Sequence, residues 1–237
     1  MRPVTALLAL GPIMVGCGDA AGGLPDAGPD LLSGNDGSSD VCGPWAAYVV
    51  GRTRQWVGRF GGGGQFETTT VVDSFDGDGL ITETVMSGDP EDDFHGEGTN
   101  HFRCDEGGLR TVDTEFEYLG LDGQVYYYES REYDPPMLRV RRNLALGDTW
   151  SESSTVTQYS SFGNSVDDLN VDYQVAAEQL VVTAAGAWNA LLVEGTNDAG
   201  DIAERDWRAP GVGAVMFATF DNGVPGFAQE LTALEDR

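Results

Sequence analysis

Two histidines, His95 and His101, are the only imidazoles in the sequence and the first candidates for acid–base or metal chemistry. A two-histidine metalloprotease site needs His-Glu-x-x-His on a helix. Here the spacing is six, and the glycine-rich stretch Gly96–Asn100 between them predicts a solvated loop. The hydrolase motif Gly-x-Ser-x-Gly is absent as well. We therefore expect no catalytic residues, no metal ligands and no cofactor.

Acidic side chains are the most abundant groups with chemical potential. The sequence has 39 Asp and Glu against 13 basic residues, all of them Arg, which gives a formal net charge of -26. Nucleic-acid binding needs a basic surface, so this class of partner is excluded. Electrostatic docking on anionic lipid head groups is disfavoured for the same reason.

The stretch Asp76-Gly77-Asp78-Gly79 resembles the centre of a calcium-binding EF-hand loop. Such a loop needs a strong first ligand two residues earlier, where Ser74 lies, and a bidentate Glu at its end, where Val85 lies. Asp-Gly pairs between strand-like runs are typical of tight hairpin turns. We expect a hairpin turn, with weak calcium binding as the alternative.

Cys17 stands in the context Met14-Val15-Gly16-Cys17, directly after an apolar run over Val4–Val15. That run is too short to span a bilayer but has the length of a signal-peptide core. A small residue followed by Cys resembles the lipobox of bacterial lipoproteins. The resemblance implies that residues 1–16 are a signal peptide, that Cys17 carries the lipid, and that the protein is anchored in the cell envelope, at the outer membrane.

Residues 17–41 read as a flexible linker behind that anchor. The segment Gly18–Asp40 is rich in Gly, Asp, Ala, Ser and Pro, and such a composition cannot bury enough apolar area to fold. Residues 42–237 then form a β-rich domain, with a subdivision near residue 135 left open.

Cys42 and Cys104 remain as a pair once Cys17 is assigned to the lipid. Exported proteins pass through an oxidising compartment, so we expect these two residues to form a disulfide. Two free buried thiols are the alternative.

The domain shows strand periodicity almost throughout. Runs rich in Val, Thr and aromatic residues alternate with short turns at residues 76–79, 122–123, 184–186, 197–200 and 221–223. We expect Pro135-Pro136 and Gly163–Asp168 to be longer interruptions between strands. This pattern predicts an all-β fold, an antiparallel meander that forms a curved sheet, an open barrel or a sandwich.

The second half of the chain carries a series of short motifs in a fixed order. They are Leu144–Trp150, Tyr173–Val175, Val181–Ala190, Trp207–Val215 and Glu230–Thr232. Their order resembles a group of uncharacterised exported bacterial proteins and lipoproteins, which implies a β-rich periplasmic or surface domain and transfers no catalytic residue. Read from the residues alone, the glycines make turns and Trp150, Trp188 and Trp207 pack over small side chains.

Three functions remain open at this stage. The first is a non-enzymatic envelope module that is bound to the membrane through its lipid and holds an envelope protein or an apolar ligand in the concavity of the sheet. The second is a carboxylate-dependent hydrolase, which needs two facing acids in a pocket. The third is a calcium-stabilised adhesion module.

Overall fold

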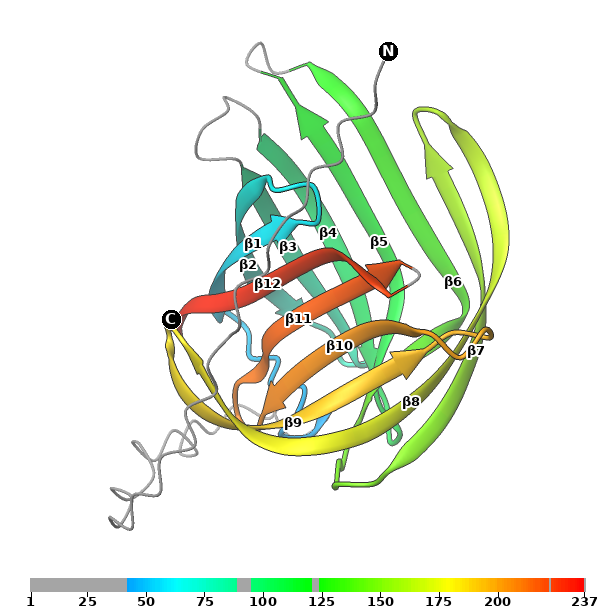
Figure 1. Cartoon of the computed structure of the whole chain (residues 1–237). Coiled ribbons are helices and arrows are strands. Elements are labelled where there is room, and N and C mark those ends of the chain that lie inside the picture. Colours follow the sequence, from blue (N-terminus) through cyan, green and yellow to red (C-terminus); the bar gives the residue numbers. More distant parts are fainter. Residues whose placement is uncertain (1–41, 89–94, 121–123, 222, 237) are drawn as a thin grey trace, which may run out of the picture. The chain divides into compact units, whose positions relative to one another are not determined.

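Antiparallel strands follow one another along the chain and close into a barrel (Figure 1). The computed structural model describes residues 42–88, 95–120, 124–221 and 223–236. The strands in these residues are β1 (Thr53–Phe60), β2 (Gln65–Phe75), β3 (Leu80–Gly88), β4 (His95–Cys104), β5 (Gly108–Leu119), β6 (Val125–Arg141), β7 (Thr149–Ser160), β8 (Gly163–Thr183), β9 (Gly186–Thr196), β10 (Ile202–Ala209), β11 (Gly213–Asp221) and β12 (Val224–Glu235).

Closure depends on the pairing of the first strand with the last. β1 pairs with β2 on one side and with β12 on the other, so that Thr53 lies opposite Glu235 and Phe60 opposite Phe227. Each of the described strands therefore has a paired neighbour on both sides. The predicted all-β antiparallel meander is confirmed, and the barrel is closed.

Short polar turns connect the strands where the sequence predicted them. Between β2 and β3, the Asp76 carboxylate accepts hydrogen bonds from the backbone amides of Asp78 and Leu80 at 2.9 and 2.8 Å. Gly79 has a φ of 87°, which a residue with a side chain rarely adopts. The turn between β9 and β10 is built in the same way, because the Asn197 side chain accepts hydrogen bonds from two backbone amides. The turn predicted at residues 122–123 lies outside the described residues.

The loop predicted at Gly96–Asn100 is wrong, because these residues lie within β4. Their glycines are not signs of a turn. The ring of Phe116 on β5 lies over Gly96 and Gly98, in the space that side chains there would occupy. An aromatic ring on the neighbouring strand thus replaces the missing side chains and keeps the glycine-rich segment in the sheet.

The two expected interruptions are also absent. β6 runs through Pro135 and Pro136, with a cis peptide bond between Asp134 and Pro135, and β8 already begins at Gly163. All described residues fall in one compact unit, on both sides of residue 135. Among the described residues, no helix has the length and apolar character needed to cross a membrane.

Side chains replace backbone pairing where β6 passes the prolines. β6 pairs with β7 only over Glu129–Asp134. Proline has no N–H to donate to a ladder. Beyond that point the Ser154 hydroxyl donates to the Pro135 carbonyl at 2.9 Å, and the Leu138 amide donates to the Glu152 carboxylate at 3.3 Å. These two contacts form a seam that holds the strands together where the ladder stops.

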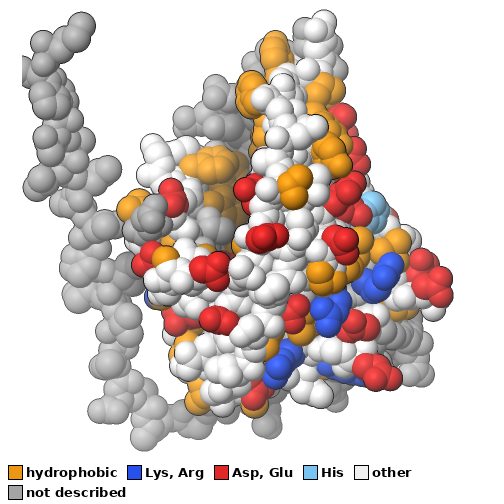
Figure 2. All heavy atoms as spheres, turned by 90° about the vertical axis from the view of Figure 1, so that its right-hand side faces the viewer, with side chains coloured by type: hydrophobic (Ala, Val, Ile, Leu, Met, Phe, Trp, Pro, Cys, Tyr) orange, Lys and Arg blue, Asp and Glu red, His pale blue; other side chains and the backbone are white. Residues whose placement is uncertain are grey.

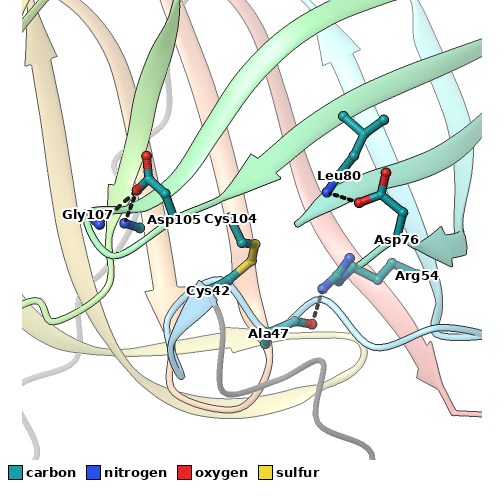
Figure 3. Close-up of a disulfide and its surroundings, with 9 residues drawn as sticks. Cys42, Ala47, Arg54, Asp76, Leu80, Cys104, Asp105 and Gly107 are labelled. Carbon is teal, nitrogen blue, oxygen red and sulfur yellow. Dashed lines mark hydrogen bonds between the residues drawn. A yellow bond between two sulfur atoms is a disulfide. The ribbon is translucent and has the colours of Figure 1, made fainter. Parts of the chain in front are cut away.

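One end of the barrel is closed by residues 42–52, which we call the floor segment. Cys42, Ala46 and Ala47 in this segment are buried, and Cys42 and Ala46 pack in the main hydrophobic core. Cys42 forms a disulfide with Cys104 at the end of β4, with a Cα–Cα distance of 4.9 Å (Figure 3). The predicted disulfide is therefore present, and it fastens the floor segment to the barrel.

Candidate functional site: a cavity inside the barrel

The barrel encloses a cavity of about 440 Å³ above the floor segment. Its lining comes from the floor segment and from nine strands, β1 to β6 and β10 to β12. In the space-filling view the molecule is hollowed beside a projecting wall, with hydrophobic side chains inside the hollow and acidic side chains around it (Figure 2). A barrel of twelve strands is wider than the eight-stranded barrels that side chains can fill completely.

Aromatic rings line the part of the cavity far from the floor segment. We call them the aromatic wall: Phe60, Phe66, Phe116, Tyr118, Phe217 and Phe227. The ring centroid of Phe66 lies 4.8 Å from that of Phe60 and 5.0 Å from that of Phe227. Such separations are typical of favourable aromatic pairs. Phe60 itself is 51% exposed, so the wall reaches the solvent.

Charged side chains occupy the opposite part, next to the floor segment. Three ion pairs form this charged floor. Arg54 lies 3.5 Å from Glu83, Arg208 lies 2.6 Å from Asp206, and Arg139 lies 3.0 Å from Glu204. The formal charges cancel within each pair.

Backbone carbonyls of the floor segment fix two of these arginines. Arg54 donates to the Ala47 carbonyl at 2.8 Å (Figure 3), and Arg208 donates to the Trp45 carbonyl at 3.2 Å. The Arg54 guanidinium also lies over the ring of Tyr48, 5.0 Å from its centroid. The floor segment therefore positions the charged groups as well as closing the barrel.

Burial dominates the protonation of these acids. It raises the pKa of Glu83, and this outweighs the opposite effect of Arg54. It likewise raises the pKa of Asp206 against the effect of Arg208. Burial also lowers the pKa of Arg54 and raises that of Tyr48. Both carboxyl groups thus hold a proton to higher pH than exposed acids do.

Two polar atoms of the charged floor have no hydrogen-bond partner. They are Nε of Arg54 and Oδ1 of Asp206, both buried, on residues that are 4% and 9% exposed. Both residues line the cavity. An unpaired buried polar atom costs about 1–3 kcal/mol. One N–H donor and one carboxylate acceptor of cavity-lining residues are therefore left unsatisfied within the protein.

The residues singled out from the sequence lie elsewhere. Cys17 is outside the described residues. His95 and His101 share β4 but lie roughly 20 Å apart along it. His101 contacts Asp113 on β5 at 2.6 Å. Among the described residues, no group of three or more His, Cys, Asp and Glu is arranged to hold a metal ion.

The three tryptophans of the second half pack within apolar clusters. Trp150 stacks on Tyr173 with ring centroids 4.9 Å apart, and Trp188 packs against Gly186. Trp207 and Trp188 belong to a second apolar cluster that also includes Trp56 and Leu231. Of these residues only Trp56 lines the cavity.

The charged floor itself was missed from the sequence. Its members come from β1, β3, β6 and β10, and no local motif joins them. The alternation of side chains between the two faces of a strand does indicate where such charges point. Arg54 and Trp56 share one face of β1, as Asp206 and Arg208 share one face of β10. A charge on the same strand face as a buried tryptophan indicates an inward-pointing charge.

Comparison with known proteins gives a likeness of fold. A protein from Bacteroides fragilis, provisionally described as exported and as having a YmcC-like fold, matches with a TM-score of 0.50 and 13% identity, over 82% of this chain and 100% of its own. A protein from Parabacteroides distasonis, provisionally described as a lipoprotein, matches with a TM-score of 0.47 and 16% identity, over 82% of this chain and 99% of its own. No family model matches the chain, and neither does any curated protein.

Proposed function

We propose that this protein is a non-enzymatic, lipid-anchored module of the cell envelope that binds a partly apolar small molecule inside its barrel. The observation that carries this proposal is the cavity. Protein interiors are normally packed without voids of this size. A volume of about 440 Å³ lies within the range of small-molecule sites, and apolar walls with a few placed polar groups are typical of them.

Three observations support the envelope location. The sequence around Cys17 resembles a lipobox. The disulfide between Cys42 and Cys104 is of the kind that persists in oxidising compartments. The protein from Bacteroides fragilis that shares the fold is itself provisionally described as exported. Anchoring at the outer membrane and modification of Cys17 are part of the proposal.

Binding of the apolar ligand is tested with N-phenyl-1-naphthylamine, an uncharged aromatic fluorophore. Thr68 on β2 lines the cavity, and Thr69 is the next residue on the same strand. We expect Thr68→Trp to fill the cavity and weaken binding of the fluorophore at least tenfold. Thr69→Trp is the matched control and should keep the wild-type affinity. Equal affinity in both variants, or no saturable binding by the wild type, would refute a binding role for the cavity.

The anchor is tested separately. Mass spectrometry of the mature N-terminal peptide should show an acylated Cys17, and Cys17→Ser should release the protein from the membrane fraction. An unmodified N-terminus in a wild-type protein that still sediments with membranes would contradict the anchor without affecting the cavity.

The carboxylate hydrolase is retained as a second candidate because Glu83 and Asp206 both line the cavity. Arg54 and Asn100 contact Glu83, and Arg208 contacts Asp206, which favours structural roles. Turnover of a nitrophenyl glycoside that is lost in Glu83→Gln and in Asp206→Asn would establish the hydrolase. The control is Glu194→Gln, which alters an ion pair with Arg205 that does not line the cavity.

Calcium-stabilised adhesion has less support from the geometry. The carboxylate of Asp76, the candidate ligand, is already used by two backbone amides of its own turn. A melting temperature that rises with millimolar calcium and falls with chelator would revive this candidate.

A further inference from the structure

The cavity is divided along its length into an apolar and a polar part. The inward residues of β1 show this division, because Arg54 lies at the charged floor and Phe60 in the aromatic wall. Six residues of strand separate them, which corresponds to roughly 20 Å. A ligand that fills the cavity therefore contacts rings along its body and polar groups at one end.

A charged head group fits this floor poorly. Each arginine of the charged floor already contacts a carboxylate, at 3.5, 2.6 and 3.0 Å. An added charge would have no opposite charge left to balance it, and an unbalanced buried charge is strongly unfavourable. The surface charge acts in the same direction for anions, since the whole chain carries -26.

The unpaired atoms specify the hydrogen bonds that a head group must make. Arg54 Nε needs an acceptor, and Asp206 Oδ1 needs a donor. A hydroxyl or a primary amide supplies both. A carboxylate only accepts, and a quaternary ammonium does neither.

We propose that the ligand is an uncharged amphiphile, whose hydroxyl- or amide-bearing head contacts Arg54 and Asp206 while its apolar chain lies along the aromatic wall. This inference rests on the proposed binding function and adds the chemistry of the ligand to it. The head enters first, because the floor segment closes the far end of the cavity and Phe60 lies at the solvent-exposed end.

The test compares three probes that are each built on a chain of ten carbons: 1-monodecanoylglycerol, decanoate and decyltrimethylammonium. Each competes with N-phenyl-1-naphthylamine below its micelle concentration. We expect 1-monodecanoylglycerol to displace the fluorophore at a concentration at least tenfold lower than either ion. Equal displacement by all three, or preference for an ion, overturns the inference while the binding function stands. Failure of the fluorophore to bind the wild type rejects both.

A charge variant tests the role of the floor directly. Asp206→Asn leaves Arg208 without its carboxylate. We expect the selectivity to move at least tenfold towards decanoate. Glu83→Gln, which leaves Arg54 without its partner, should move it in the same direction and is the second variant if the first does not fold.

The matched control is Glu194→Gln, which removes the same charge from an ion pair outside the cavity. It should keep the wild-type order of the three probes. An unchanged order in folded Asp206→Asn and Glu83→Gln, judged by their retained affinity for the fluorophore, overturns the assignment of the head group to this floor.

Discussion

At the end of the barrel closed by the floor segment, a disulfide and buried ion pairs join distant parts of the chain, whereas at the opposite end long hairpins expose aromatic side chains. Phe162, between β7 and β8, is 89% exposed, and Tyr126 on β6 is 69% exposed. Figure 1 shows the hairpins β5–β6 and β7–β8 extending beyond the shorter strands β10 to β12. The covalent and ionic links between distant parts of the chain are therefore concentrated at the closed end.

Removal of the disulfide should have the largest effect on this contrast. The bridge joins residues 62 positions apart, and the chain-entropy treatment gives it about 4 kcal/mol of the free energy of unfolding. We expect the double variant Cys42→Ser, Cys104→Ser to lose that amount in urea unfolding. A loss below about 1 kcal/mol would mean that the floor segment stays in place without its bridge.

Breaking a buried ion pair should come next. Arg54→Met leaves the Glu83 carboxyl group buried without a counter-charge and the Ala47 carbonyl without its donor, and the expected loss is about 3 kcal/mol. Glu194→Gln breaks a more exposed pair with Arg205 and should cost less than about 1 kcal/mol. The urea midpoints of the two variants compare a buried ion pair of the charged floor with a more exposed pair. Equal losses in the free energy of unfolding would contradict the difference between the two regions.

The pH dependence of stability should separate two sets of acids. Glu83 and Asp206 have raised pKa values in the folded state, so their contribution is complete below their ordinary values of 4.5 and 3.8 and is lost as pH rises through the raised values. Asp236, whose pKa is lowered by a hydrogen bond from Arg52, contributes above 3.8 and loses this as pH falls.

Urea midpoints measured from pH 3 to pH 8 give the check on these signs. The double variant Glu83→Gln, Asp206→Asn should lose the decline on the alkaline side and keep the decline on the acidic side. Asp236→Asn should weaken only the acidic decline. If the double variant still loses stability as pH rises, groups other than Glu83 and Asp206 cause that loss.

A smaller effect is expected at the seam between β6 and β7. Ser154→Ala leaves the Pro135 carbonyl without its hydrogen bond, which should cost about 1 kcal/mol. Hydrogen exchange of the Leu138 amide, bonded to Glu152, reports whether the seam opens locally. Unchanged stability and exchange would show that the seam does not hold the strands.

The smallest effect belongs to the open end. Phe162→Ser should change the free energy of unfolding by less than about 0.5 kcal/mol, because the side chain is almost wholly exposed. A loss above 1 kcal/mol would indicate that its ring contact with Tyr127, at 5.4 Å, is structural.

Turns and strands were predictable from the sequence, because Asp-Gly and Asn-rich turns act locally. The turn at Asp76–Gly79 is one example, since Asp76 needs only its own neighbours to form it. Gly96–Asn100 was predicted wrongly because the ring that keeps it in the sheet, Phe116, belongs to another strand. Pro135-Pro136 was predicted wrongly because Ser154, from β7, satisfies the broken ladder.

Neither the closure of the barrel nor the charged floor could be predicted from local sequence, because both depend on contacts between distant strands. Whether an antiparallel meander closes depends on one pairing, between β1 and β12, whose partners Thr53 and Glu235 lie at opposite ends of the domain. The partners Arg54 and Glu83 lie on strands that are not neighbours in the sheet. The disulfide was the one contact between distant residues that we predicted, because two cysteines in an oxidising compartment usually pair.

The pairing of β1 with β12 also sets the order in which the protein can mature. Any machinery that delivers the chain from its N-terminus delivers Val224–Glu235 last, and β1 waits with one side unpaired until then. An unpaired strand edge is a template for wrong association. Loss of the C-terminal strand would therefore leave two such edges, on β1 and β11, and turn a closed barrel into an open sheet prone to join with its own copies.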